Sequence, residues 1–220
     1  MLSKKVLFII TSRAQYEDGT PTGLWLEEAS EPYHILTEDG IQVDIVSIEG
    51  GEIPLDPNST QNDELNKYAQ FVEKIKNVPS IDEVNVIEYD AVYLPGGHGT
   101  VFDFAHNQRL ANILSDFKNE GKFISSVCHG PSAFVGAKDK NGKYLVEGVT
   151  LTSFTDNEER AMGLEDKVPF LTQTALEQQG AQFITNEDFT EHIETDNQFI
   201  TGQNPQSSVA IGKALRDALN

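Results

Sequence analysis

Short apolar segments alternate with amphipathic segments along nearly the whole chain, and this rhythm restricts the fold more than any other feature of the sequence. The apolar segments lack the strict alternation of a half-exposed strand, which indicates a sheet that is covered on both faces. Strands that alternate with helices favour parallel pairing through helical crossovers. The sequence therefore predicts an α/β fold with a doubly wound, mostly parallel sheet sandwiched between helices.

The expected elements follow from hydrophobic periodicity and from the residues that begin and end helices. The predicted strands are Val6–Ile10, Val43–Ile48, Ala91–Leu94, Phe123–Val127, Thr150–Phe154, Gln182–Thr185 and Phe199–Thr201. The predicted helices are Leu24–Glu38, Asp63–Lys76, Phe102–Asn119, Pro131–Ala137, Asp156–Met162, Phe170–Gln179 and Ser207–Leu219. Because no linker or change of composition divides the chain, residues 1–220 are expected to form one domain.

The chain is strongly acidic: its 220 residues include 16 basic and 35 acidic side chains, a formal net charge of −19. Such a charge repels phosphate backbones and anionic lipid, so neither nucleic acid nor a membrane is expected as a partner. The apolar run after Lys4 and Lys5 ends after about five residues, too short for export or for a membrane span, and is expected to be a buried strand. A single cysteine cannot form an internal disulfide, which agrees with a cytoplasmic location.

That cysteine, Cys128, lies between a predicted strand and a predicted helix, in the segment Val127-Cys128-His129-Gly130-Pro131. A sharp turn from strand to helix would place the thiol at the positive end of the helix dipole, beside exposed backbone N–H groups. We therefore predict a catalytic thiol whose pKa lies below the free value of about 8.5. The alternative is a buried cysteine with a structural role only.

A second turn, Pro95-Gly96-Gly97-His98-Gly99, follows another predicted strand. In open α/β sheets the ligand crevice lies beyond the carboxyl ends of the strands, so both turns are expected to face one pocket. Glycines let the backbone approach a ligand closely, and an exposed N–H can stabilise a developing oxyanion. The alternative is an ordinary tight turn, and the spacing matches neither a dinucleotide fingerprint nor a phosphate loop.

Four segments in this order resemble the ThiJ/PfpI superfamily, which has the class I glutamine amidotransferase-like fold: Leu94–Thr100, Val127–Pro131, Ser153–Asp156 and Thr201–Pro205. Within it they are similar to the branch of glyoxalase III enzymes and heat-shock-type chaperones. The resemblance implies a flavodoxin-like sandwich, a homodimer and a strained nucleophile elbow at Cys128. It also implies glutathione-independent conversion of a small dicarbonyl, methylglyoxal, to lactate without a redox cofactor or required metal.

The resemblance also implies roles for individual residues. The nucleophile falls on Cys128 and its neighbour on His129. The pocket carboxylate falls on Glu28, which fits the pattern Glu-Ala-x-x-Pro-aromatic, whereas Glu27 points to another helical face and Glu31 lies one turn further on. A carboxyl group beside a thiolate in a partly dry pocket is expected to have a raised pKa.

The carboxylate that orients the histidine is expected after Phe-Thr-Asp, and the spacing favours Glu159. Helix capping or contact with solvent is expected for Asp156 and Glu158. The oxyanion donors are expected to be the N–H groups of Gly97 and His129.

The substrate-binding turn is expected to include Gly96 and His98. The chemistry is consistent with these assignments, because a thiolate adds to an aldehyde to give a hemithioacetal, and a base and an acid must then move a proton between adjacent carbons. Glu28 and His129 suit these two roles.

Two other functions remain open. A thiolate with a histidine also attacks acyl groups, as in a peptidase or amidase of the same fold. The one His-x-Glu pattern of a glutaminase dyad, His192-Ile193-Glu194, precedes the last predicted strand. That strand is expected to keep His192 beyond hydrogen-bond reach of the turn that follows it and faces Cys128.

The second alternative is a holdase chaperone with exposed apolar surface. The aromatic residues that could form such a surface are Trp25, Phe102, Phe104 and Phe170. Alternatively, these residues pack in the core or the pocket.

Overall fold

The computed structural model describes residues 2–220. The strands are β1 (Lys5–Ile10), β2 (Gln42–Ser47), β3 (Ala91–Leu94), β4 (Phe123–Val127), β5 (Thr150–Leu151), β6 (Gln182–Phe183), β7 (Ile193–Asp196) and β8 (Phe199–Gly202). The α-helices are α1 (Leu26–Glu38), α2 (Glu64–Lys67), α3 (Ala69–Lys74), α4 (Thr100–Asp103), α5 (Gln108–Asn119), α6 (Asp156–Ala161), α7 (Thr172–Gln178) and α8 (Ser208–Leu219). Short 3-10 helices are η1 (Pro57–Thr60), η2 (Ile81–Glu83), η3 (Val86–Glu88), η4 (Gly130–Phe134) and η5 (Pro205–Ser207).

The central sheet has six strands in the order β2-β1-β3-β4-β8-β7. All neighbouring pairs are parallel except β7 and β8, which are antiparallel. Strand β4 is an interior strand, with Val92 of β3 opposite Ile124 and Ile200 of β8 opposite Ser125. The mostly parallel α/β fold predicted from the sequence is confirmed.

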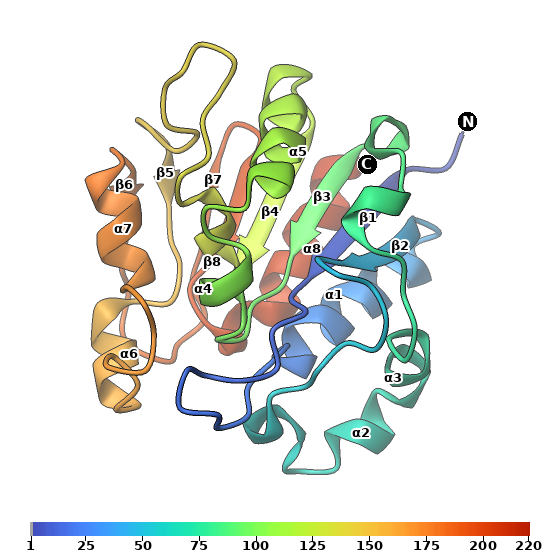
Figure 1. Ribbon diagram of the computed structural model, residues 1–220. Helices are drawn as coiled ribbons and strands as arrows, with labels where there is room; N and C mark the ends of the chain where they lie inside the picture. Colours follow the sequence, from blue (N-terminus) through green and yellow to red (C-terminus); the bar gives the residue numbers. More distant parts are fainter. Residues whose placement is uncertain (1) are drawn as a thin grey trace.

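Helices cover both faces of this sheet, with α1 and α8 on one face and α5 on the other (Figure 1). Alternate residues of β1 belong to two separate cores: Val6 and Phe8 pack with α1 and α8, while Leu7 and Ile9 pack with α5. All four side chains are fully buried. Burial on both faces explains why the strands read as continuous apolar runs rather than as alternating ones. Among residues 2–220, none of the helices combines the length and apolarity that a bilayer crossing requires.

Several predicted helices are shorter or interrupted. The segment 63–76 is divided into α2 and α3 at Tyr68, and the segment 102–119 contains a break at His106, whose φ is +56°. Helix α5 starts after that break because the Asn107 side chain accepts a hydrogen bond from Leu110 N. The predicted helix Pro131–Ala137 is the 3-10 helix η4, which is followed by Gly136 at a φ of +83°.

The strand predictions differ from the structure at one side of the sheet. The strands expected over Thr150–Phe154 and Gln182–Thr185 are reduced to β5 and β6, which pair with each other in a separate parallel ribbon. Strand β7 was not predicted, because its sequence Ile-Glu-Thr-Asp is polar, as suits the edge of a sheet. It turns back onto β8 through Asn197, which has a φ of +55°.

Candidate functional site

The polypeptide turns sharply at the end of β4, where Cys128 has a φ of +60°. This conformation is costly for a residue with a side chain, so the surroundings must hold it. They do so through the Cys128 backbone, whose N–H donates to Gly202 O at 2.9 Å and whose carbonyl accepts from Phe154 N at 2.8 Å. The sharp turn expected for a nucleophile elbow is therefore present, fixed between β8 and the segment after β5.

A cavity of about 270 Å³ opens at this turn. It is mainly apolar, and its wall contains both predicted turns, because Gly97 and His98 line it together with Cys128 and His129. The remaining lining residues are Trp25, Glu27, Phe154, Met162, Phe189, Pro205 and Gln206. The expectation that the two turns face one pocket is confirmed, and Trp25 contributes to the pocket wall.

His129 connects the thiol to a carboxylate. Its Nδ1 lies 3.4 Å from Cys128 Sγ, and its Nε2 lies 2.6 Å from Glu159 Oε2. Because a carboxylate oxygen only accepts, Nε2 carries the ring proton and Nδ1 presents a lone pair to the thiol. Burial lowers the pKa of His129, and the neighbouring His98 lowers it further, which favours the neutral ring.

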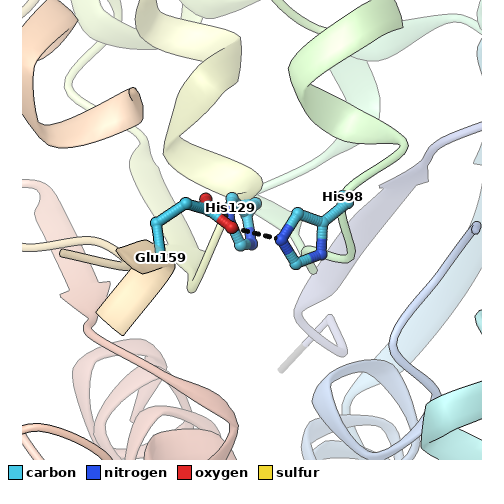
Figure 2. Close-up of side chains that lie close together, drawn as sticks. All are labelled: His98, His129 and Glu159. Atoms are coloured by element: carbon cyan, nitrogen blue, oxygen red, sulfur yellow. Dashed lines mark hydrogen bonds and ion pairs between the residues drawn. The ribbon is translucent and has the colours of Figure 1, made fainter. Parts of the chain in front are cut away.

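His98 shares the same carboxylate. Its Nε2 lies 2.6 Å from Glu159 Oε1, and the centres of the two imidazole rings are 4.0 Å apart. Figure 2 shows both rings beside the Glu159 carboxyl group. Burial raises the pKa of Glu159, but His129 and then His98 outweigh it and hold the pKa well below the usual range. Sequence reasoning placed His98 at the substrate-binding turn but gave no sign of this contact.

Two imidazoles and a carboxylate are also a set that binds divalent metals. The ligand atoms of His98, His129 and Glu159 lie within 4.8 Å of one another. Each Nε2, however, already has its own carboxylate oxygen as a hydrogen-bond partner. Both imidazole Nε2 atoms are thus already paired with the Glu159 carboxylate, and a cation would have to replace both hydrogen bonds.

Glu28 approaches the thiol from α1. It is fully buried, its Oε1 accepts from Gly96 N at 2.8 Å, and its Oε2 has no hydrogen-bond partner among the described residues. Burial raises the pKa of Glu28 well above the usual range, although the Cys128 thiol and Gly96 N–H oppose this. A protonated, unpartnered Oε2 can donate a hydrogen bond to a bound group.

The acidic neighbours of Glu28 lie elsewhere. Glu27 is at the wall of the cavity, and Glu31 accepts a hydrogen bond from Tyr68 Oη at 2.7 Å. Of the three acids on this part of α1, Glu28 alone is fully buried.

The expected low pKa of the thiol is wrong. Burial raises the pKa of Cys128 well above the usual range, and the Glu28 carboxyl group adds to the effect. The reason is that η4, which follows the elbow, is a five-residue 3-10 helix and not an α-helix. Its few peptide dipoles do not offset burial, so the thiol needs a base, and His129 Nδ1 is next to it.

Two backbone N–H groups lie at the cavity wall, one from Gly97 in the glycine-rich turn and one from His129 in the turn after β4. Gly97 has a φ of +105°, and a Cβ atom there would overlap Gly23 O. Within the described part of the chain, the N–H groups of Gly97 and His129 have no hydrogen-bond partner, whereas Gly96 N–H is used by Glu28. Free N–H groups beside a nucleophile are the arrangement that stabilises an oxyanion.

The expectation for Glu158 is half correct. Glu158 caps α6, because its side chain accepts from Thr155 N while Thr155 Oγ1 accepts from Glu158 N. Contact with solvent is wrong: the residue is fully buried. Its carboxylate also accepts from the backbone of Phe189 and from two side-chain amides that were not foreseen, those of Gln203 and Asn204.

The His192-Ile193-Glu194 segment was expected to lie away from the turn after β8, and this is wrong for its backbone. Because β7 pairs antiparallel with β8, His192 O accepts from Gln203 N at 3.0 Å. The His192 ring, however, pairs with Glu194 at 3.2 Å. Among the described residues, the imidazole in contact with Cys128 Sγ is that of His129.

The chain is similar in sequence to several known proteins. A family model described as the DJ-1/PfpI family matches residues 4–218. The glutathione-independent glyoxalase HSP31 of Saccharomyces cerevisiae is 32% identical, over 100% of this chain and 99% of its own length. Glyoxalase 3 of Candida albicans is 32% identical, over 93% of this chain and 94% of its own.

The fold is also similar to those of solved structures. The crystal structure of glyoxalase III from Candida albicans has a TM-score of 0.89 and 30% identity, covering 98% of this chain and 97% of that one. A rapid encystment protein of 24 kDa from Francisella tularensis has a TM-score of 0.93 and 37% identity, covering 99% of both chains.

Proposed function

The chain belongs to the DJ-1/PfpI family, and on this premise we propose that it is a glutathione-independent glyoxalase that converts methylglyoxal to lactate with Cys128 as the nucleophile. The contact between Cys128 Sγ and His129 Nδ1, with Glu159 behind the imidazole, carries the proposal. Full-length relatives named as glutathione-independent glyoxalases support it. The mostly apolar cavity suits a small, uncharged dicarbonyl.

In the first step, Cys128 Sγ bonds to the aldehyde carbon of methylglyoxal. His129 Nδ1 takes the thiol proton and then returns it to the aldehyde oxygen, which becomes the hydroxyl of a hemithioacetal. The N–H groups of Gly97 and His129 stabilise the negative charge that develops on that oxygen. Glu159 holds the proton on His129 Nε2, so that Nδ1 stays available as the base.

In the second step, the hydroxyl-bearing carbon loses its proton and the adjacent ketone carbon gains one, while the hydroxyl proton passes to the former ketone oxygen. The first carbon is oxidised and the second is reduced, so the intermediate becomes a thioester of lactate with no external electron acceptor. Glu28 is the group for this transfer, because it is buried beside the thiol and burial raises the pKa of its carboxyl group, which makes the carboxylate a stronger base. Water then hydrolyses the thioester, and the net reaction adds one water molecule to methylglyoxal.

The decisive experiment supplies purified protein with methylglyoxal in the absence of glutathione and follows D-lactate with a stereospecific assay. The wild-type protein should form D-lactate, and Cys128→Ala should form none. Wild-type protein that consumes no methylglyoxal would contradict the proposal. If methylglyoxal is consumed but no lactate forms, Cys128 could still be the nucleophile, but the proposed conversion to lactate would be wrong.

The amidase and chaperone alternatives have less support. A glutaminase dyad would need an imidazole from the turn after β8, but the His192 ring beside that turn is paired with Glu194. The aromatic residues considered for a chaperone surface are not freely exposed, since Phe104 is buried and Trp25 lines the cavity. We retain a homodimer in the cytoplasm as part of the proposal, on the strength of the family resemblance.

A further inference from the structure

Glu158 is a fully buried carboxylate that the proposed reaction does not use. Its carboxylate has four hydrogen-bond partners, all N–H donors, two for each oxygen. Oε1 accepts from Thr155 N at 3.0 Å and Gln203 Nε2 at 3.2 Å. Oε2 accepts from Phe189 N at 2.8 Å and Asn204 Nδ2 at 3.0 Å.

The two amide side chains cannot be turned around without losing other contacts. Gln203 Oε1 accepts from Asn186 N, so its Nε2 must face Glu158. Asn204 Nδ2 also donates to Thr190 O, and Asn204 Oδ1 accepts from Ser207 Oγ. The carboxylate is therefore surrounded by donors whose orientation is fixed, and no neutral side chain of this size can accept from all four.

These contacts tie together three segments that are distant in sequence: the start of α6, the loop between β6 and β7, and the turn after β8. The loop carries Phe189, and the turn carries Pro205 and Gln206, all of which line the cavity. The ring of Phe189 lies 6.1 Å from that of Phe154, which in turn lies 4.4 Å from His129.

Phe189 depends on this anchor more than an ordinary loop residue does. Its φ is +56°, and the residue is 38% exposed, so packing alone does not hold the ring in place. The hydrogen bond from its N–H to Glu158 fixes the backbone at the strained position.

We propose that Glu158 is a positioning residue that sets substrate specificity, by fixing Phe189 as the wall that contacts the substituent on the dicarbonyl. This inference rests on the proposed glyoxalase function and extends it to the substrate class, namely 2-oxoaldehydes with an apolar substituent larger than methyl. Methylglyoxal is too small to depend on this wall, whereas the ring of phenylglyoxal would pack against Phe189.

The test uses Glu158→Gln, which preserves size but points an NH₂ group at fixed donors. The KM for phenylglyoxal should rise about tenfold or more, as expected when an apolar contact in a pocket is lost, while the KM for methylglyoxal changes less than about threefold. A matched control is Glu177→Gln, an exposed acid on α7, which should alter neither value. In a Phe189→Ala background, Glu158→Gln should add no further discrimination between the two substrates.

Three results would overturn the inference. The first is an equal fall in kcat for both substrates with unchanged KM, because Glu158 would then act only through Glu159. The second is a Phe189→Ala variant in which the ratio of the KM for phenylglyoxal to the KM for methylglyoxal equals that of the wild type. This result can be obtained even if Glu158→Gln does not fold. The third is a wild-type protein that turns over methylglyoxal but rejects phenylglyoxal.

A readout without activity separates this inference from the proposed function. In Glu158→Gln, amide hydrogen exchange over residues 186–190 should quicken, while exchange in β4 stays unchanged. Wild-type protein without glyoxalase activity would refute the proposed function alone. Unchanged exchange over 186–190 would refute the anchor whether or not the enzyme is active.

Discussion

Two histidines share one carboxylate in this site, and the positions of the protons among these groups decide which atom can act as a base. Glu159 accepts from Nε2 of both His98 and His129, so the remaining nitrogen of His129 faces the thiol without a proton. The thiol is itself protonated because it is buried. In the proposed mechanism, Cys128 is therefore activated by proton transfer to His129 when substrate is bound.

This arrangement predicts a shift of the pH profile in His98→Asn. Burial and then His98 lower the pKa of His129, so removal of the second imidazole should raise that pKa. Because His129 must be neutral to accept the thiol proton, activity is lost below its pKa, and the acid limb should move to higher pH. We expect this in kcat/KM for methylglyoxal between about pH 5 and pH 8. An acid limb that stays in place or moves to lower pH would contradict the role of His98.

The thiol itself gives a second prediction. Burial raises the pKa of Cys128 and the Glu28 carboxyl group raises it further, so Glu28→Gln should lower the pH at which iodoacetamide reacts. In the wild type, the midpoint of the alkylation rate against pH should lie above the pKa of a free cysteine, about 8.5. Glu31→Gln serves as the control, because Glu31 binds Tyr68. A wild-type midpoint below the free value would show that local dipoles outweigh burial.

The third prediction concerns the anchor of the imidazole. Glu159→Gln keeps the size of the side chain but cannot accept from both histidines, so His129 loses its fixed tautomer. Turnover should fall by about 100-fold or more, as in triads that lose their carboxylate. The substitution should act on kcat and not on the KM ratio of two substrates, which distinguishes it from Glu158→Gln. Turnover within a few-fold of the wild type would remove Glu159 from the mechanism.

At the scale of elements, the packing of α8 on α1 depends on a glycine. A Cβ atom at Gly212 would lie 2.9 Å from Pro32 Cα, which is backbone and cannot turn away. Gly212→Ala should therefore lower the free energy of unfolding by about 1–3 kcal/mol, although alanine is the better helix former. Chemical denaturation would measure the loss, with Lys213→Ala on the exposed side of α8 as the control. An increase in stability would mean that the two helices separate at little cost.

The sequence was sufficient for the elements whose burial is uniform. Strands β1, β3, β4 and β8 lie inside the sheet, and most of their residues are buried and apolar, so each appears in the sequence as a short apolar run. Edge elements were harder to find, because β7 has one polar face and its pairing with β8 depends on a turn at Asn197.

The site, like the fold, was predictable only in part. The turns at Cys128 and Gly97 could be placed together because parallel strands end at one edge of a sheet. The burial of Glu158 could not be foreseen, since its partners come from a loop and a turn that no local pattern connects to α6. The contact of His98 with Glu159 depends in the same way on where α6 packs.

At the scale of the whole molecule, the net charge of −19 has a measurable effect. Acidic groups repel one another in the compact state, and dissolved salt screens that repulsion. Raising NaCl from about 0.01 M to about 0.15 M, where the Debye length falls to about 8 Å, should therefore raise the Tm by about 2–4 °C. A Tm that falls over this range would show that attractive ion pairs dominate the surface.

The pairing of β4 also has a consequence for biosynthesis. Cys128 is held by Gly202 O on one side, yet the ribosome must make β5, α6, α7, β6 and β7 before it reaches β8. Until then the growing chain has an unpaired β4 edge, which is the kind of surface that chaperones protect. The same delay keeps the thiol out of its elbow, so a half-made chain carries an ordinary cysteine, and the arrangement of Cys128 described above forms only once β8 is in place.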